Sequence, residues 1–206
     1  MWFTDRRDAG RQLAARLGAV PDAVVVGLPR GGVPVAAEVA RALGAPLDIC
    51  VVRKLGVPVQ PELGMGAIGE GGARVLDERI RLAARVTNAQ LAEVERVERA
   101  ELARRSARYR GGRPPVELSG RTVVVVDDGI ATGSTAKAAC RIVRQRGAAR
   151  VVLAVPVAPA GWRDRLRGEA DELVCVAEPA DFLAIGSFYA DFGQTTDAEV
   201  LDALLG

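Results

Sequence analysis

The sequence predicts an α/β protein with a doubly wound, mainly parallel sheet, helices on both faces and a long inserted helical segment. Three observations lead to this prediction. Short runs rich in Val, Ile and Leu alternate with segments of helical period. These runs are apolar throughout, as expected of parallel strands covered on both faces. One long charged stretch, 77–110, interrupts the alternation.

In the first half of the chain, helices are recognised by a capping residue at their start and a glycine after their end. Continuous apolar runs indicate strands, and clusters of proline and glycine indicate loops. The expected elements are a helix from Thr4 to Gly18, a strand over 23–28, a helix ending at Gly44, a strand over 47–55 and a loop over 55–72.

The second half begins with the charged stretch, in which Glu and Arg recur at spacings of three and four residues, as on a solvated helix with one apolar stripe. The elements expected here are a short strand over 74–77, a long helix or helix pair over 77–110, a strand over 122–126, a helix over 134–147, a strand over 150–158, a helix near 160–167, a strand over 172–178 and a short terminal helix. We expect one domain over 1–206, with a core of about 23–76 and 121–177, a helical insertion of about 77–112 and a tail of about 178–206.

The composition excludes several classes of chemistry. The chain has 206 residues, a net charge of +2 and no histidine, so Ser-His and Cys-His nucleophiles and His-bound metals are excluded. Its charge gives no strong nucleic-acid signal. We expect no membrane span, because no apolar run approaches about 20 residues. The three cysteines lie singly in apolar segments, which indicates reduced, buried thiols and a cytoplasmic location.

One stretch, "TVVVVDDGIATGST" from Thr122, is chemically unusual. A buried strand ends on two neighbouring carboxylates, which repel each other and lose hydration, so something must compensate them. In parallel sheets, ligands bind beyond the carboxyl ends of the strands. The turns 29–32, 53–72 and 127–135 all lie there, and we expect them to converge.

The helix that follows the acids is suited to binding an anion. Gly133, Ser134 and Thr135 open it, so free N–H groups and the positive end of the helix dipole favour a monophosphate. The stretch is not the phosphate loop of nucleotide hydrolases, because Ser134 stands where a lysine is needed. A simpler alternative is that Ser134 or Thr135 only caps the helix, although this leaves Asp127 and Asp128 unexplained.

The thirteen residues "VVVVDDGIATGST" resemble the phosphoribosyl pyrophosphate signature of type I phosphoribosyltransferases. The resemblance implies that Asp127 and Asp128 accept hydrogen bonds from the ribose hydroxyls. It also implies that the 5-phosphate is held by Ala131, Thr132, Gly133, Ser134 and Thr135. Magnesium would arrive on ligand oxygens, in part through water to Asp127 or Asp128, with no direct ligand from the chain.

The segment "GLPRGG" resembles the pyrophosphate loop of this family. The resemblance implies contacts from Arg30, Gly31 and Gly32 to pyrophosphate, and a cis peptide bond between Pro29 and Arg30. The alternative is an ordinary tight Gly-Gly turn.

The segments "VVRKLG" and "GEGG" resemble those that bracket the mobile loop of orotate phosphoribosyltransferases. This likeness implies that Arg53 and Lys54 contact the pyrophosphate; the alternative is a basic strand end facing solvent. Residues 55–73 depart from the pattern, because they contain no Lys, Arg or His. Arg74 is the nearest substitute.

Four aromatic residues gather in the tail, including Phe188 and Tyr189. Core packing is one explanation for them. The other is a hood over a planar acceptor base, as family members build from variable segments. Ala131 occupies the position where enzymes for 6-oxopurines carry an aspartate, and adenine-specific enzymes have alanine there.

Together these features predict a phosphoribosyltransferase that transfers ribose 5-phosphate from phosphoribosyl pyrophosphate to a nitrogen acceptor, such as a nucleobase. Its catalytic residues would be Lys54, Arg53 and Asp128, its cofactor Mg²⁺ and its assembly a homodimer. The alternative is a phosphoribosyl pyrophosphate-sensing regulator or an RNA-binding protein on the same fold. An interaction scaffold built on 77–110 would leave the acid pair unexplained.

Overall fold

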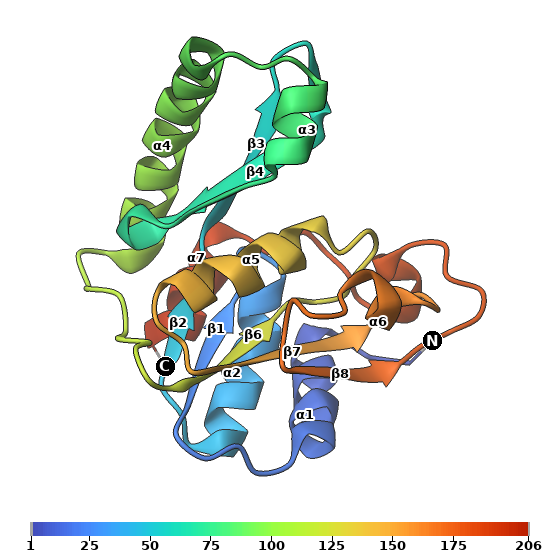
Figure 1. Cartoon of the computed structure of the whole chain (residues 1–206). Coiled ribbons are helices and arrows are strands. Elements are labelled where there is room, and N and C mark those ends of the chain that lie inside the picture. Colours follow the sequence, from blue (N-terminus) through green and yellow to red (C-terminus); the bar gives the residue numbers. More distant parts are fainter. Residues whose placement is uncertain (1, 206) are drawn as a thin grey trace.

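The computed structural model describes residues 2–205, and its body is built on a five-stranded sheet (Figure 1). The strand order is β2-β1-β6-β7-β8, and every neighbouring pair is parallel. The strands are β1 (Ala23–Gly27), β2 (Leu47–Ile49), β6 (Thr122–Val126), β7 (Arg150–Val157) and β8 (Glu172–Ala177). The predicted doubly wound parallel sheet is confirmed.

Helices cover both faces of this sheet (Figure 1). One face carries α1 (Arg6–Leu17) and α2 (Gly32–Leu43), and the other carries α5 (Ser134–Gln145) and the short α6 (Trp162–Arg165). Successive valines of β6 point to opposite faces, as in any strand. Val124 and Val126 therefore pack with α1 and α2, whereas Val123 and Val125 pack with α5.

The first helix begins one residue later than predicted. Asp5, not Thr4, is its N-cap, and the Asp5 side chain accepts a hydrogen bond from the backbone N–H of Asp8. The predicted glycine stops are confirmed: Gly18 follows α1, and Gly44 follows α2 in the left-handed conformation.

A second, antiparallel sheet rises from the body and forms a projecting arm (Figure 1). It consists of β3 (Val52–Val57), β4 (Gln60–Gly69) and β5 (Arg74–Leu76), with a 3-10 turn, η1 (Glu70–Gly72), before β5. The prediction of one strand over 47–55 was wrong, because the chain leaves the parallel sheet after Ile49. The prediction of a loop over 55–72 was also wrong.

The glycines of β4 explain that error, because they permit close strand pairing here rather than breaking the strand. A Cβ at Gly66 would collide with the carbonyl oxygen of Val75 on β5. Between these glycines, Met65, Ala67 and Ile68 are buried. Glycine content alone therefore indicated a loop where apolar burial produced a strand.

The inserted segment is a helix pair, α3 (Glu78–Ala83) and α4 (Asn88–Arg110), which packs on the arm sheet. Thr87 and Gln90 form a capping box at the start of α4. The predicted apolar stripe largely covers the arm sheet, since Leu91 and Leu102 are buried, whereas Val97 stays half exposed.

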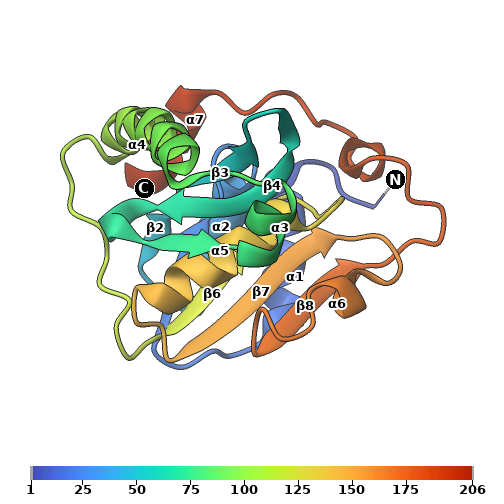
Figure 2. The ribbon, with the colours of Figure 1, turned by 45° about the horizontal axis from the view of Figure 1, so that its top comes forward.

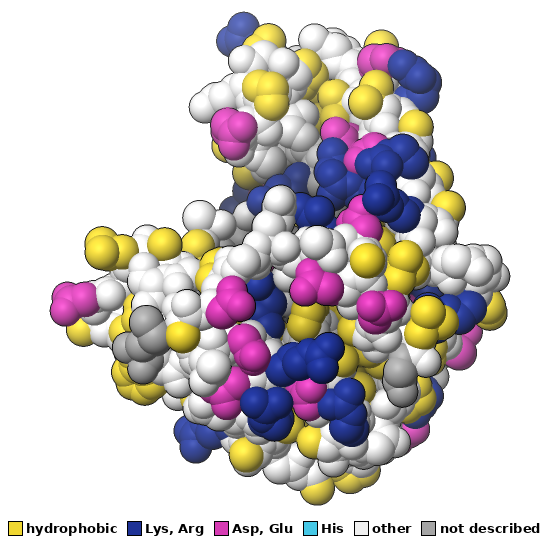
Figure 3. Space-filling model, turned by 180° about the vertical axis from the view of Figure 1, so that it is seen from behind, with side chains coloured by type: hydrophobic (Ala, Val, Ile, Leu, Met, Phe, Trp, Pro, Cys, Tyr) yellow, Lys and Arg dark blue, Asp and Glu magenta, His cyan; other side chains and the backbone are white. Residues whose placement is uncertain are grey.

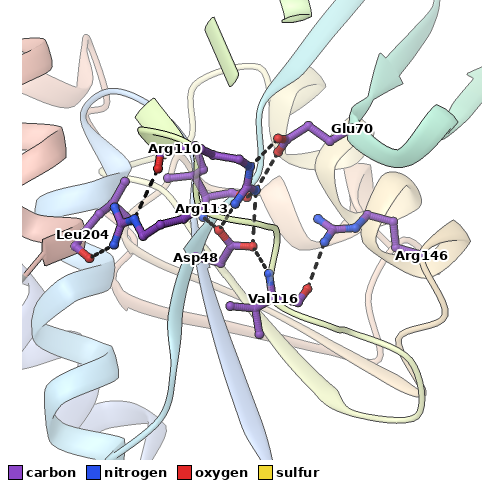
Figure 4. A network of polar contacts seen from close by, with 8 residues as sticks. Asp48, Glu70, Arg110, Arg113, Val116, Arg146 and Leu204 are labelled. Atoms are coloured by element: carbon purple, nitrogen blue, oxygen red, sulfur yellow. Dashed lines mark hydrogen bonds and ion pairs between the residues drawn. The ribbon is translucent and has the colours of Figure 1, made fainter. Parts of the chain in front are cut away.

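Arg110, the last residue of α4, joins the arm to the body (Figure 4). Its guanidinium donates to Asp48 of β2 at 2.7 Å and to Glu70 of η1 at 2.8 Å. Asp48 also accepts from the backbone N–H of Val116 at 2.9 Å. All three charged side chains are about nine-tenths buried.

The tail returns to the body through η2 (Ile185–Phe188) and α7 (Asp197–Leu205). Val200 of α7 packs in the same cluster as Val33 of α2 and Tyr109 of α4, and Figure 2 shows α7 beside α4. Over residues 2–205, none of the helices has the length and apolar character that a bilayer crossing requires.

Candidate functional site

The site is built around Asp127 and Asp128, which follow β6 at the carboxyl end of the central strand. Both side chains are partly buried. Burial raises the pKa of Asp127 well above its ordinary value, and the neighbouring charge of Asp128 raises it further. Burial also raises the pKa of Asp128, and Arg6 opposes this rise. In the absence of a ligand, the pair is thus only partly compensated.

Arg6 of α1 provides the compensation. Its Nε lies 2.9 Å from Oδ2 of Asp128, and both side chains are 13% exposed. Its Nη1 donates to the carbonyl oxygen of Gly193 at 2.7 Å, and its Cζ lies 4.0 Å from the ring centroid of Phe192. The sequence analysis missed Arg6, because no local pattern distinguishes it from the other arginines of α1.

The "PRGG" turn lies directly against the acids. A Cβ at Gly31 would collide with Oδ2 of Asp128, and one at Gly32 would be 2.7 Å from the carbonyl oxygen of Val126. Neither glycine has a positive φ, so close approach to the acids, rather than an ordinary tight turn, accounts for glycine here. The Pro29–Arg30 peptide is cis, as the resemblance implied.

The start of α5 forms another part of the site. Gly133 is its N-cap, with φ of 84°, and no side chain caps the helix. The capping alternative for Ser134 and Thr135 was therefore wrong. The Thr132 and Ser134 hydroxyl oxygens lie 3.3 Å apart, and the side chains of residues 131, 132, 134 and 135 are exposed. The Ser134 N–H lies 3.5 Å from Oγ1 of Thr132, so the first N–H groups of the helix stand beside exposed hydroxyls.

Lys54 and Arg53 point to opposite faces of β3. The Lys54 ammonium donates to Oγ of Ser134 at 2.7 Å, which brings the arm to the start of α5. The Arg53 guanidinium instead pairs with Glu98 of α4 at 2.6 Å. Neighbouring residues of a strand face opposite sides, so in this structure the two side chains are directed apart, whereas contacts from both to the pyrophosphate were predicted. The structure brings Lys54, but not Arg53, to the start of α5.

The side chain of Arg30 turns toward α7. Its Nη1 lies 3.8 Å from Oδ1 of Asp197, and it is 38% exposed. The three turns that were expected to converge do so, with 29–32 against the acids and Lys54 against Ser134.

Two of the four aromatic residues of the tail, Phe188 and Tyr189, lie in the core. The rings of Phe188 and Tyr189 are 7% and 4% exposed and pack with Phe3, which favours the core-packing alternative for these two. The Tyr189 hydroxyl donates to the carbonyl oxygen of Asp128 at 2.6 Å. Both rings are thus packed in the core and present no free face to a base, and the Tyr189 hydroxyl holds the backbone of the acid pair.

Asp127 and Asp128 are the two carboxylates of the site. In the part of the chain that the structure describes, no three His, Cys, Asp or Glu side chains are grouped as a metal cage. Glu70, the carboxylate of "GEGG", is held by Arg110. The site thus offers oxygen acceptors, helix N–H groups and one ammonium.

Several known proteins resemble this chain in sequence or structure. A family model described as the phosphoribosyl transferase domain matches residues 9–192. Proteins from two Mycobacterium tuberculosis strains, each named "Putative phosphoribosyl transferase", are 56% identical over 201 residues, which are 97% of this chain and 45% of theirs. The chain therefore spans less than half the length of these curated relatives.

Two further relatives are informative. The adenine phosphoribosyltransferase of Kineococcus radiotolerans is 44% identical over 75 residues, covering 32% of this chain and 40% of that protein. The crystal structure of TT1426 from Thermus thermophilus matches with a TM-score of 0.90 at 47% identity, covering 100% of this chain and 98% of that one. The match to TT1426 extends over the arm as well as the body.

Proposed function

The chain belongs to the phosphoribosyl transferase domain family, a class of glycosyltransferase-type enzymes, and from this premise we propose that it transfers the 5-phosphoribosyl group of phosphoribosyl pyrophosphate to a nitrogen acceptor. The acceptor that we propose is a nucleobase. The observation that carries this proposal is the convergence of an incompletely compensated acid pair, a glycine turn and an uncapped helix start.

Each part of the donor has a counterpart in this arrangement. The 5-phosphate would accept hydrogen bonds from the N–H groups and hydroxyls at the start of α5. The ribose hydroxyls would donate to Asp127 and Asp128, replacing water that burial has removed from these acids. The pyrophosphate would then lie toward residues 30–32. In this way the ligand supplies the compensation that the acid pair lacks.

The chemistry asks for placement and charge stabilisation rather than a covalent intermediate. The bond from C1 of the ribose to the pyrophosphate oxygen breaks with both electrons on the leaving group, and the acceptor nitrogen forms the new bond to C1. Positive charge develops on the ribose meanwhile, and the Asp127 and Asp128 carboxylates lie on that side of the ligand. Preorganised charge of this kind is typically the largest contribution to catalysis.

Mg²⁺ is the cofactor that we propose, carried on the oxygens of the donor. Asp127 and Asp128 would hold it, in part through water, because hard cations prefer oxygen ligands. When bound, the ion would neutralise charge on the leaving pyrophosphate. Arg6, which already pairs with Asp128, keeps that carboxylate oriented toward the same ligand.

A cytoplasmic location and a homodimer are further proposals. The three cysteines are free and buried, and burial raises the pKa of the Cys50 and Cys140 thiols to about 12. Such thiols are inert and are typical of proteins in reducing compartments. Sedimentation velocity would measure the assembly.

The test is an assay of pyrophosphate release from phosphoribosyl pyrophosphate and Mg²⁺ across a panel of bases. Release that depends on one base supports the transferase. Binding of phosphoribosyl pyrophosphate without release with any base would favour the regulator, for which the engagement of Arg53 by Glu98 is the supporting observation.

Asp128→Asn provides the matching variant. The amide keeps the size of the side chain and an oxygen for Arg6, but it loses charge-assisted hydrogen bonds worth about 1.5–3 kcal/mol each. We expect calorimetry to show phosphoribosyl pyrophosphate binding weakened by about 10- to 100-fold, with little change in melting temperature. Equal affinity in variant and parent would remove the acid pair from the ligand site.

A further inference from the structure

Asp197, the first residue of α7, gathers three groups from distant parts of the chain. Its Oδ2 lies 2.6 Å from Nη2 of Arg108 on α4. Its Oδ1 accepts a hydrogen bond from the Tyr109 hydroxyl at 3.0 Å and lies 3.8 Å from Nη1 of Arg30. One carboxylate thus holds an arginine of the "PRGG" turn beside an arginine of the insertion.

This carboxylate is not needed to begin α7. Thr196 and Glu199 cap the helix by themselves: the Glu199 N–H donates to Oγ1 of Thr196 at 3.2 Å, and the Thr196 N–H donates to Oε2 of Glu199 at 2.7 Å. The Asp197 side chain is directed to the arginines instead. Contacts with Arg30 and Arg108, rather than capping of the helix, therefore determine the position of the Asp197 side chain.

The two arginines retain donors beyond those that Asp197 uses. Arg108 is 55% exposed and Arg30 is 38% exposed, and each guanidinium carries five N–H groups. Seen from behind, Lys and Arg side chains gather on the arm and where it meets the body (Figure 3). The cluster can accordingly bind a second anion, or exchange its carboxylate for a stronger one.

The cluster also lies next to the site. Arg30 directly precedes Gly31, the residue that approaches Asp128 most closely. The arm segment 55–73, from which leaving-group cations were expected, contains no Lys, Arg or His, and Arg53 faces Glu98. An anion leaving the ribose beside the acids would thus meet Arg30 first and Arg108 next.

We propose that Arg108, together with Arg30, forms the subsite for the pyrophosphate group, and that Asp197 occupies this subsite until the ligand displaces it. This inference rests on the proposed function for the identity of the anion. The insertion then supplies in α4 a cation that the arm segment 55–73 lacks. Diphosphate, with several charged oxygens, suits paired guanidinium groups better than one carboxylate does.

The test is calorimetric binding of inorganic pyrophosphate, with Mg²⁺ present, to the whole chain. Arg108→Gln should weaken binding about 10- to 100-fold, the range expected for losing a charge-assisted contact, and ribose 5-phosphate binding should stay within about twofold. The matched control is Arg96→Gln, which removes a charge from the same helix at an exposed pair with Glu93. It should change neither affinity.

Asp197→Asn tests whether the Asp197 carboxylate occupies the place of the ligand or only positions the two arginines. The amide keeps an acceptor for Tyr109 but does not compete for the guanidinium groups, so pyrophosphate should bind several-fold more tightly. Unchanged or weaker binding would overturn the stand-in role. The subsite itself is overturned if the parent does not bind pyrophosphate, or if Arg108→Gln and Arg96→Gln behave alike.

These outcomes are distinct from those of the transferase assay. Base-dependent release with no effect of Arg108→Gln on pyrophosphate affinity would leave the proposed function standing and remove this subsite. Pyrophosphate binding that depends on Arg108, with no release from phosphoribosyl pyrophosphate, would support this subsite and argue against the proposed function.

Discussion

Arg6 and Asp128 are separated by 122 residues in sequence, yet Nε of the first donates to Oδ2 of the second at 2.9 Å. A residue of the first helix therefore lowers the pKa of an acid at the candidate site, against the effect of burial. Because Arg6 is also held by Gly193 and lies over Phe192, the tail contributes to the same contact.

The pH dependence of ligand binding should move when Arg6 is changed. Arg6 lowers the pKa of Asp128 against the effect of burial, so Arg6→Gln should raise that pKa further. Ribose hydroxyls bind the ionised acid, hence affinity for phosphoribosyl pyrophosphate should increase with pH in both proteins and do so at higher pH in the variant. Calorimetry at a series of pH values above the ordinary aspartate pKa of about 3.9 would measure this shift.

Arg11→Gln is the control for this experiment, because Arg11 lies on the same helix and pairs with Asp8 instead. Parallel pH profiles for parent and Arg6→Gln would show that Arg6 only holds α1 in place.

Asp127→Asn should stabilise the unliganded protein at neutral pH. The folded pKa of Asp127 is raised, so the folded state binds its proton more tightly than the unfolded state does. Stability from this group is therefore lost as pH rises from the unfolded value of about 3.9 through the folded pKa. The melting temperature of the variant should exceed that of the parent at pH 7, and the two should meet at low pH. A lower melting temperature at pH 7 would contradict this sign.

Lys54→Met should weaken the binding of ribose 5-phosphate as well as that of phosphoribosyl pyrophosphate. The sequence alone predicted an effect on the leaving group, but the ammonium donates to Ser134 at the start of α5. Losing it removes a cation beside the proposed 5-phosphate site, which should cost about tenfold in each affinity. Lys137→Met is the control, since Lys137 pairs with Glu169. A defect in turnover alone would return Lys54 to the pyrophosphate.

Adenine or a non-purine nitrogen base should be a better acceptor than guanine or hypoxanthine. Ala131 cannot exchange a proton with a 6-oxopurine, general acid–base help is typically worth a factor of about 10²–10⁴, and Glu70 is held by Arg110. Steady-state rates with each base at fixed phosphoribosyl pyrophosphate are the measurement, and guanine as the best substrate would refute the argument.

The sequence predicted the parts of the site whose physics is local. An apolar run, two acids and a glycine before a helix specify β6, the acid pair and the start of α5 within one continuous segment. The arm was missed because Gly66 and its neighbours suggested a loop, although the alternation of Gly64 and Gly66 with the buried Met65 and Ala67 is a strand pattern. Arg53 and Lys54 already lay in the predicted strand 47–55, so the alternation of faces along a strand could have separated the two side chains.

Arg6, Arg108 and Asp197 could not have been found in the same way. Each makes its contact across more than eighty residues, and each sits in a segment where charged residues are ordinary. Phe188 and Tyr189 were singled out by their clustering in sequence. That clustering did not indicate whether their ring faces would be buried or free to stack on a base.

The junction at Arg110 has a consequence for how the molecule opens. Detaching the arm together with α4 would separate Arg110 from Asp48 of the body and leave this buried carboxylate without its cation. Breaking such a buried pair costs about 3–5 kcal/mol. Small openings of the arm are thus suppressed relative to complete unfolding. Hydrogen exchange should reveal one cooperative unit, in which amides of β4 become accessible together with those of β2 rather than ahead of them.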